Sequence, residues 1–169
     1  MGAPNLGPTC ARVAAAMVLA ASGAAALSGC TTGQPSSTSA WQSASDRALG
    51  EVISGLGTAR IVIEQEQRDR LPHAYAVETV TDAIESSGLE ISSYQVAQPP
   101  DDLHRANAEV GDALDEASSL LVEIRVAIAS PGLTAVSADR LLDRIDTLRD
   151  ELDQLDKAVM NEPESVGAR

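Results

Sequence analysis

The sequence predicts an all-α protein: an antiparallel up-down-up-down four-helix bundle that follows a leader segment and a flexible linker. Three observations lead to this prediction. Apolar residues recur every three or four positions in four segments between residues 43 and 161, which is the period of a helix. The segments are joined by connections of only a few residues, and short connections force consecutive helices to run antiparallel. The chain after residue 29 is long enough to form one hydrophobic core.

Residues 1–29 have the pattern of a cleaved signal peptide. Arg12 is the only charged side chain before Asp46, and an apolar stretch of about 15 residues follows it. This length is typical of a signal-peptide core and is short for a helix that spans a membrane.

The apolar stretch ends in Leu27-Ser28-Gly29-Cys30, which resembles the lipobox of bacterial lipoproteins. The resemblance implies that a diacylglycerol is attached to the sulfur of Cys30 and that signal peptidase II cleaves just before this residue. It also implies a lipid-anchored protein on the extracytoplasmic face of the cell membrane. Two acyl chains are enough for stable anchoring. The alternative is an ordinary secretory signal that is cleaved near Ala26.

Residues 30–42 are predicted to comprise the lipidated Cys30 and a disordered linker rich in Ser, Thr and Pro. Residues 31–40 carry no charge and no large apolar side chain, so this segment cannot bury enough surface to fold. Ten such residues span roughly 17–19 Å as a random coil.

The first helix is expected from Ser43 to Arg70, with an N-terminal cap in the first four residues. Gly50 and Gly57 lie one heptad apart on one face of this helix. They either allow a neighbouring helix to approach closely or mark a flexible turn. The expected apolar stripe is Leu49, Val52, Leu56, Ala59 and Ile63.

The other three helices are expected over residues 72–96, 100–130 and 138–161, followed by a disordered tail over 162–169. Pro72 suits a first helical position, and Asp101 and Asp102 suit a first turn, where the helix dipole favours negative charge. The last helix keeps its apolar spacing over three heptads. This regularity also fits an alternative in which two long helical hairpins pair only in a homodimer.

The charge of the chain excludes nucleic acid as a partner. The sequence has 12 Lys and Arg against 25 Asp and Glu, a net charge of −13, and phosphate contacts require a basic patch. Cleavage before Cys30 removes one Arg and no acid, which leaves the mature chain at −14. Such acidic helix faces are usually solvated surfaces, although they could also bind cations or a basic partner.

Nothing in the sequence points to an enzyme, a cofactor or a metal. No Ser lies in a Gly-x-Ser-x-Gly elbow. His73 and His104 begin consecutive helices, so they lie at opposite ends of an up-down bundle and cannot share a metal ion. Met160 and His104 lie at the same end, and we interpret them as a residue of a frayed helix end and an exposed side chain rather than as haem ligands.

The end of the bundle that is remote from the linker contains a candidate partner site. Arg70, Tyr75 and Leu133 lie in or beside the two connections at this end, and exposed apolar and aromatic groups beside Arg are typical of interface cores. The alternative is that Leu71 and Leu133 only staple the helix ends.

These features favour a non-enzymatic, lipid-anchored envelope protein that acts as an interaction or accessory module with a protein partner in the cell envelope. The alternative function is a carrier that holds a small apolar ligand between its helices. A cavity of several hundred Å³ in the core would favour the carrier.

Overall fold

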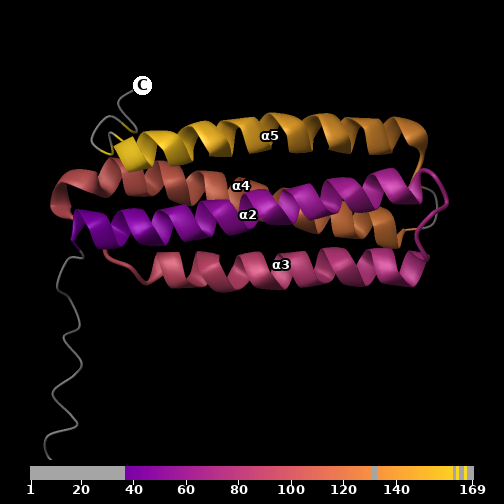
Figure 1. Cartoon of the computed structure of the whole chain (residues 1–169), viewed down its shortest axis with the longest axis horizontal. Helices are drawn as coiled ribbons and strands as arrows, with labels where there is room; N and C mark the ends of the chain where they lie inside the picture. Colours follow the sequence, from indigo (N-terminus) through magenta and orange to yellow (C-terminus); the bar gives the residue numbers. More distant parts are fainter. Residues whose placement is uncertain (1–36, 131–132, 162, 164–165, 167–169) are drawn as a thin grey trace, which may run out of the picture. The chain divides into compact units, whose positions relative to one another are not determined.

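The computed structural model describes residues 37–130, 133–161, 163 and 166, and these form an all-helical protein. The predicted helical class is therefore confirmed, and no strand occurs among the described residues. The described residues form four long helices, and Figure 1 shows them lying side by side. They are α2 (Thr38–Glu66), α3 (His73–Gln95), α4 (His104–Ala129) and α5 (Ala135–Asn161), with a short 3₁₀ turn η1 (Asp101–Leu103) before α4.

Helix α2 begins five residues earlier than predicted, inside the expected linker. Ser37 caps the helix by accepting a hydrogen bond from the Ala40 backbone N–H at 3.2 Å, and Trp41 is completely buried. The prediction that residues 38–42 are disordered is wrong, because Trp41 extends the apolar stripe backward at helical spacing, through Ser45 and Ala48 to Val52. Burial of one Trp side chain outweighs the low hydrophobicity of its Ser- and Thr-rich neighbours.

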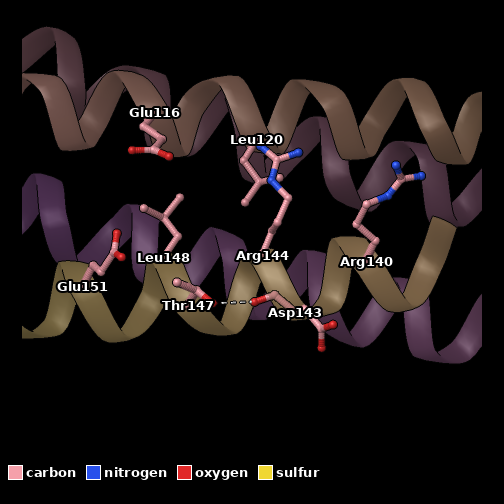
Figure 2. A pocket seen from close by; sticks show the side chains of 8 residues that line it. All are labelled: Glu116, Leu120, Arg140, Asp143, Arg144, Thr147, Leu148 and Glu151. Atoms are coloured by element: carbon pink, nitrogen blue, oxygen red, sulfur yellow. Dashed lines mark hydrogen bonds between the residues drawn. The ribbon is translucent and has the colours of Figure 1, made fainter. Parts of the chain in front are cut away.

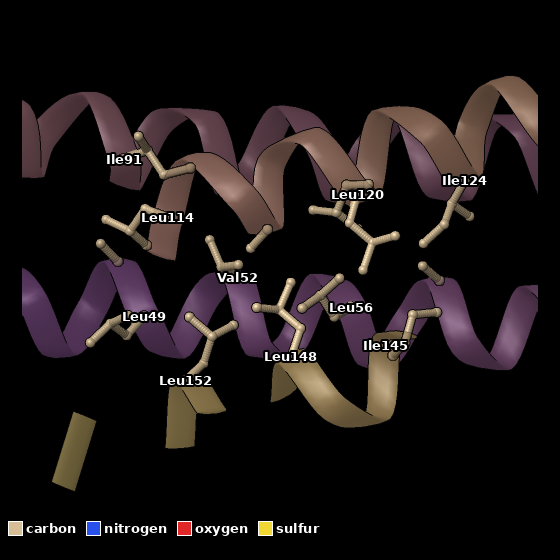
Figure 3. Packing of buried hydrophobic residues seen from close by; sticks show 14 of the residues in the cluster. Leu49, Val52, Leu56, Ile91, Leu114, Leu120, Ile124, Ile145, Leu148 and Leu152 are labelled. Carbon is tan, nitrogen blue, oxygen red and sulfur yellow. The ribbon is translucent and has the colours of Figure 1, made fainter. Parts of the chain in front are cut away.

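Helix α2 packs against α3, α4 and α5 and makes the most extensive contacts with the other helices. Figure 3 shows Leu49, Val52 and Leu56 of α2 between the side chains of α4 and those of α5. The largest fully buried side chains come from these helices and from η1. They are Trp41, Leu49, Leu56, Ile63, Leu103, Leu114, Leu120, Leu121, Ile124, Ile128, Ile145 and Leu152.

The close contact between α2 and α3 occurs at Gly55. The sequence suggested no role for this glycine of α2. A Cβ atom at Gly55 would lie 2.9 Å from Ser87 Oγ and 3.6 Å from the Ala83 carbonyl oxygen of α3. At Gly50 no atom lies within 4 Å of this position, and at Gly57 only the guanidinium of Arg149 does, at 3.8 Å. Gly50 and Gly57 therefore neither admit a neighbouring backbone nor interrupt α2, which runs through both as a continuous helix.

The two ends of the helices are joined by specific hydrogen bonds. At the end where α2 begins, Gln42 Nε2 donates to the Val159 carbonyl of α5 at 2.9 Å, and we call this the tether end. At the other end, Gln67 Nε2 donates to Asp139 Oδ1 at 3.2 Å. We call this end the tip, comprising residues 67–75 and 133–139.

The predicted disordered tail contains a buried residue. Val166 is 6% exposed and belongs to the core, and its N–H donates to the Pro163 carbonyl at 3.3 Å. Val166 and Pro163 line a groove with Ala106 at the start of α4, so this apolar side chain fixes part of the tail to the tether end. Residues 162, 164–165 and 167–169 lie outside the described part of the chain.

The contrast between two glycines of α2 gives a stability test. Gly50→Ala should raise the free energy of unfolding by about 0.5–1 kcal/mol, because it removes backbone freedom without a clash. Gly55→Ala should lower it by about 1–3 kcal/mol, because the new methyl group overpacks the contact with Ser87. Adding Ser87→Ala to Gly55→Ala should recover most of this loss. If urea unfolding showed the two single variants to be equally stable, this result would contradict the close contact between Gly55 and Ser87.

Candidate functional site

The structure divides the predicted tip residues into two kinds. Tyr75, in the first turn of α3, is 60% exposed, and Arg70 is also exposed. Leu133 is half-buried and packs against the core, as does Leu71. The two leucines therefore staple helix ends, and of the three predicted tip residues Arg70 and Tyr75 are presented to solvent. Cys30 lies outside the described residues.

Arg70 is held in place by an unusual backbone conformation. Asp69 adopts a left-handed φ of 50°, which turns the chain so that the Arg70 N–H donates to the Gln65 carbonyl at 3.0 Å. The neighbouring Arg68 forms an ion pair with Glu64 at 3.7 Å. No carboxylate of the described residues lies within ion-pairing distance of Arg70, so its charge is available to a partner.

The tether end contains a polar network that sequence reasoning missed. The Trp41 indole Nε1–H donates to Asn107 Oδ1 at 2.9 Å. The Tyr94 hydroxyl lies 2.8 Å from the same Oδ1 and 2.9 Å from the Asn107 carbonyl. One side chain of α4 thus joins α2 and α3, and two of the three aromatic residues of the chain meet at it.

Burial determines the ionisation of Tyr94. Its side chain is 3% exposed, and desolvation raises its pKa from 10.0 to about 12, although the adjacent Trp41 side chain partly opposes the shift. The neutral hydroxyl is therefore retained throughout the physiological range. Its contribution to stability is fully present below about pH 10 and is lost as the pH rises toward 12, because the unfolded chain releases the proton first.

The sequence contained a signal for part of this network. Trp41 lies at helical spacing from Ser45, Ala48 and Val52, so its position on the stripe of α2 could have been read. Asn107 is one residue beyond Ala106 of the α4 stripe, and no pattern indicates which helices its amide joins. A hydrogen-bond partner on another helix depends on the relative rotation of the helices, which periodicity does not specify.

The grooves between helices are lined by carboxylates. Figure 2 shows the groove between α4 and α5, whose volume is about 270 Å³. Leu120 and Leu148 form its apolar part, while Arg140, Arg144, Glu116 and Glu151 surround them. Arg144 bridges the two helices by donating to Glu123 Oε2 at 2.6 Å. Such a groove is suited to polar contacts rather than to an apolar ligand.

The two histidines and the acidic side chains of the described residues do not gather into a metal site. No group of three or more His, Cys, Asp or Glu side chains in this part of the chain could hold a metal ion. His104 lies 3.9 Å from Asp101, and His73 lies 4.0 Å from Glu66; both histidines are exposed. Among the described helices, none has a stretch apolar and long enough to cross a bilayer.

Comparison with protein-family models, curated proteins and solved structures finds no match to this chain.

The Asn107 network gives a second stability test. Asn107→Ala should lower the free energy of unfolding by about 1–3 kcal/mol, because the buried indole N–H of Trp41 loses its acceptor. Tyr94→Phe should cost less, about 0.5–1.5 kcal/mol, because the Trp41 bond to Asn107 survives. Urea unfolding followed through the fluorescence of Trp41, the single Trp of the chain, measures both. Ser119→Ala, on the exposed face of α4, is the control. An Asn107→Ala variant as stable as this control would exclude a structural role for the network.

Proposed function

We propose that the protein is a lipid-anchored, non-enzymatic interaction module that acts at the outer face of the cell membrane and presents its tip to a protein partner in the envelope. The observation that carries the proposal is the difference between the two ends of the molecule. The end nearest to Cys30 along the chain is joined by part-buried hydrogen bonds between three helices, whereas the other end exposes Arg70 and Tyr75.

The proposed topology is an antiparallel up-down-up-down four-helix bundle. Its support is the pairing of helix ends: Gln42 near the start of α2 bonds to the end of α5, and Gln67 at the end of α2 bonds near the start of α5. The Tyr94 and Asn107 contact likewise joins the end of α3 to the start of α4. These three contacts are those expected when consecutive helices alternate in direction.

The position of Thr38 limits how far the proposed anchor can lie from the folded part. Seven residues separate Cys30 from Thr38, the first residue of α2. This segment spans at most about 29 Å when fully extended. Helix α2 extends about 44 Å from the tether end to the tip. An anchor at Cys30 would therefore hold the tether end close to the bilayer and leave the tip able to reach farther outward.

The charge distribution distinguishes the two halves of the molecule. The half of the molecule toward the tether end, residues 38–51, 85–116 and 149–161, contains fourteen acids and four bases. The half toward the tip, residues 52–84 and 117–148, contains nine acids and six bases. A partner that approaches the tip meets a net charge of −3, against −10 at the tether end.

The polar grooves argue against the alternative of an apolar carrier. The described grooves have volumes of about 270, 470, 430 and 370 Å³, and each is lined by at least two carboxylates. Sites for small apolar ligands are lined predominantly by hydrophobic side chains. We therefore propose interaction with a protein in preference to transport of an apolar molecule.

Purification from native membranes tests both parts of the proposal. The intact mass of the wild-type chain should correspond to residues 30–169 plus acyl chains, and Cys30→Ser should move the protein out of the membrane fraction. After chemical crosslinking, the Arg70→Ala/Tyr75→Ala variant should recover at least fivefold less partner than the wild type, because it removes the guanidinium and the aromatic ring that the proposal assigns to the interface.

The matched control is Leu89→Ala/Val96→Ala. These two side chains are 70% and 81% exposed, and they lie on α3 and at its C-terminal cap, toward the tether end. The control should recover as much partner as the wild type. An unacylated chain would overturn the proposed lipid anchor. Equal losses of recovered partner in the tip variant and in the control would overturn the proposal that the tip binds the partner.

A further inference from the structure

The last two turns of α3 expose two large apolar side chains at the tether end. Leu89 is 70% exposed, and Val96, at the C-terminal cap, is 81% exposed, the highest value for a large apolar side chain among the described residues. The two residues are seven positions apart, so they lie on one face of the helix, about 10 Å from each other along its axis. Ser92 and Ser93 lie between them and are also exposed. We call these four residues the α3 corner.

No charged side chain belongs to the α3 corner. Glu85 precedes Leu89 by one turn, and Glu90 lies about 100° around the helix from Leu89 and is half-buried. The next acid along the chain is Asp101, so residues 91–100 carry no charge, although 22% of the whole chain is charged. The acids that make the tether half of the molecule negative therefore lie outside this surface.

Polar groups in and beside the α3 corner have few free donors. The Ser92 hydroxyl donates to the Gly88 carbonyl of its own helix at 2.7 Å. Pro99 and Pro100, in the connection that follows, have no backbone N–H. Donors that lose water without gaining a partner are the main cost of entering an apolar medium. This surface can therefore leave water at a lower cost than a helix end with several free N–H groups.

The α3 corner lies at the end of the molecule where the proposed anchor joins the folded part. Seven residues separate Cys30 from Thr38, which limits their distance to about 29 Å. Asn107 joins the first turns of α2 to the last turn of α3, because it accepts hydrogen bonds from both Trp41 and Tyr94. An acyl anchor at Cys30 would therefore keep the corner beside the bilayer at a high effective concentration, at which a small apolar surface is sufficient for contact.

We propose that the α3 corner rests on the lipid bilayer, with Leu89 and Val96 at the boundary between the headgroups and the acyl chains. The proposal rests on the proposed function, because it requires the anchor at Cys30, and it assigns a lipid-binding surface to the folded part itself. Apolar area buried at the boundary drives the contact. The molecule then leans on the end of α3, and the tip remains the end farther from the membrane.

Fluorescence quenching in vesicles tests the contact directly. The membrane-extracted chain with Val96→Cys is labelled with a thiol-reactive nitrobenzoxadiazole dye and reconstituted into phosphatidylcholine vesicles. Cys30 is acylated in this chain and Cys10 precedes the cleavage site, so the introduced thiol is the one that reacts. A nitroxide on the lipid acyl chains should quench this dye at least threefold more strongly than the same dye at Val136→Cys. Val136 is the matched control, because it is 78% exposed and lies at the tip.

One added charge on the α3 corner should abolish the contact. Leu89→Asp in the labelled Val96→Cys chain should reduce quenching by the lipid nitroxide to the level of the Val136 control, because a carboxylate is costly to remove from water. Val136→Asp adds the same charge at the tip and should leave the quenching unchanged. Equal losses in the two Asp variants would show a response to net charge alone, and this result would overturn the proposal. Thermal melts identify any variant that fails to fold, and Leu89→Ser then replaces Leu89→Asp.

The mass measurement and the quenching measurement can fail separately. An intact mass without acyl chains would overturn the proposed anchor and this contact with it. An acylated chain in which the lipid nitroxide quenches the dyes at positions 96 and 136 equally would overturn the contact alone. Recovery of the partner through the tip should be unaffected by Leu89→Ala/Val96→Ala in either case, because this variant leaves both Cys30 and the tip intact.

Discussion

The structure depends on the burial of helix α2 by three other helices. The chain contains no Phe, and its two buried aromatic rings, Trp41 and Tyr94, both lie at the tether end, so aliphatic side chains fill the rest of the core. Helix α2 instead combines leucines that reach α4 and α5 with small residues that let α3 approach closely. Gly55 is the extreme case, because its missing side chain leaves room for Ser87 and for the Ala83 carbonyl. Close packing of this kind replaces the area that aromatic residues would have buried.

The same helix connects the proposed anchor to the folded part of the protein. The few aromatic residues are concentrated at its first turns, where Trp41 and Tyr94 share Asn107 as their acceptor. Gln42, the next residue, donates to two carbonyls at the end of α5. A load applied at Cys30 would therefore reach α3, α4 and α5 within two turns of α2. The tip, at the opposite end, has exposed side chains and few such constraints.

Periodicity predicted most of the fold and little of the detail that distinguishes its ends. The spacing of Leu141, Ile145, Leu148 and Leu152 was sufficient to place α5, because apolar residues at alternating steps of three and four indicate a helix. Composition gave the wrong prediction around Trp41. The Ser- and Thr-rich segment was judged by its average hydrophobicity and not by the one residue that buries a large area.

The candidate site was predictable only where exposure follows from helix ends. Arg70 and Tyr75 were placed correctly at the tip, whereas Leu133 turned inward to cover the core. Which of Gly50, Gly55 and Gly57 lies at the contact with α3 depends on the rotation of α2 relative to α3. The periodicity of a single sequence does not specify this rotation.

Native-state hydrogen exchange of the first turns of α2 tests the account most directly. If Trp41 fixes this segment in the core, the amides of Ser45, Ala48 and Leu49 should exchange about as slowly as those of Leu120, Leu121 and Ile124 in α4, because both sets open only when the whole core unfolds. Exchange of the α2 amides at the rate of an unstructured chain, with α4 still protected, would contradict the account and show that the chain is flexible as far as Leu49, beyond the linker predicted over residues 30–42.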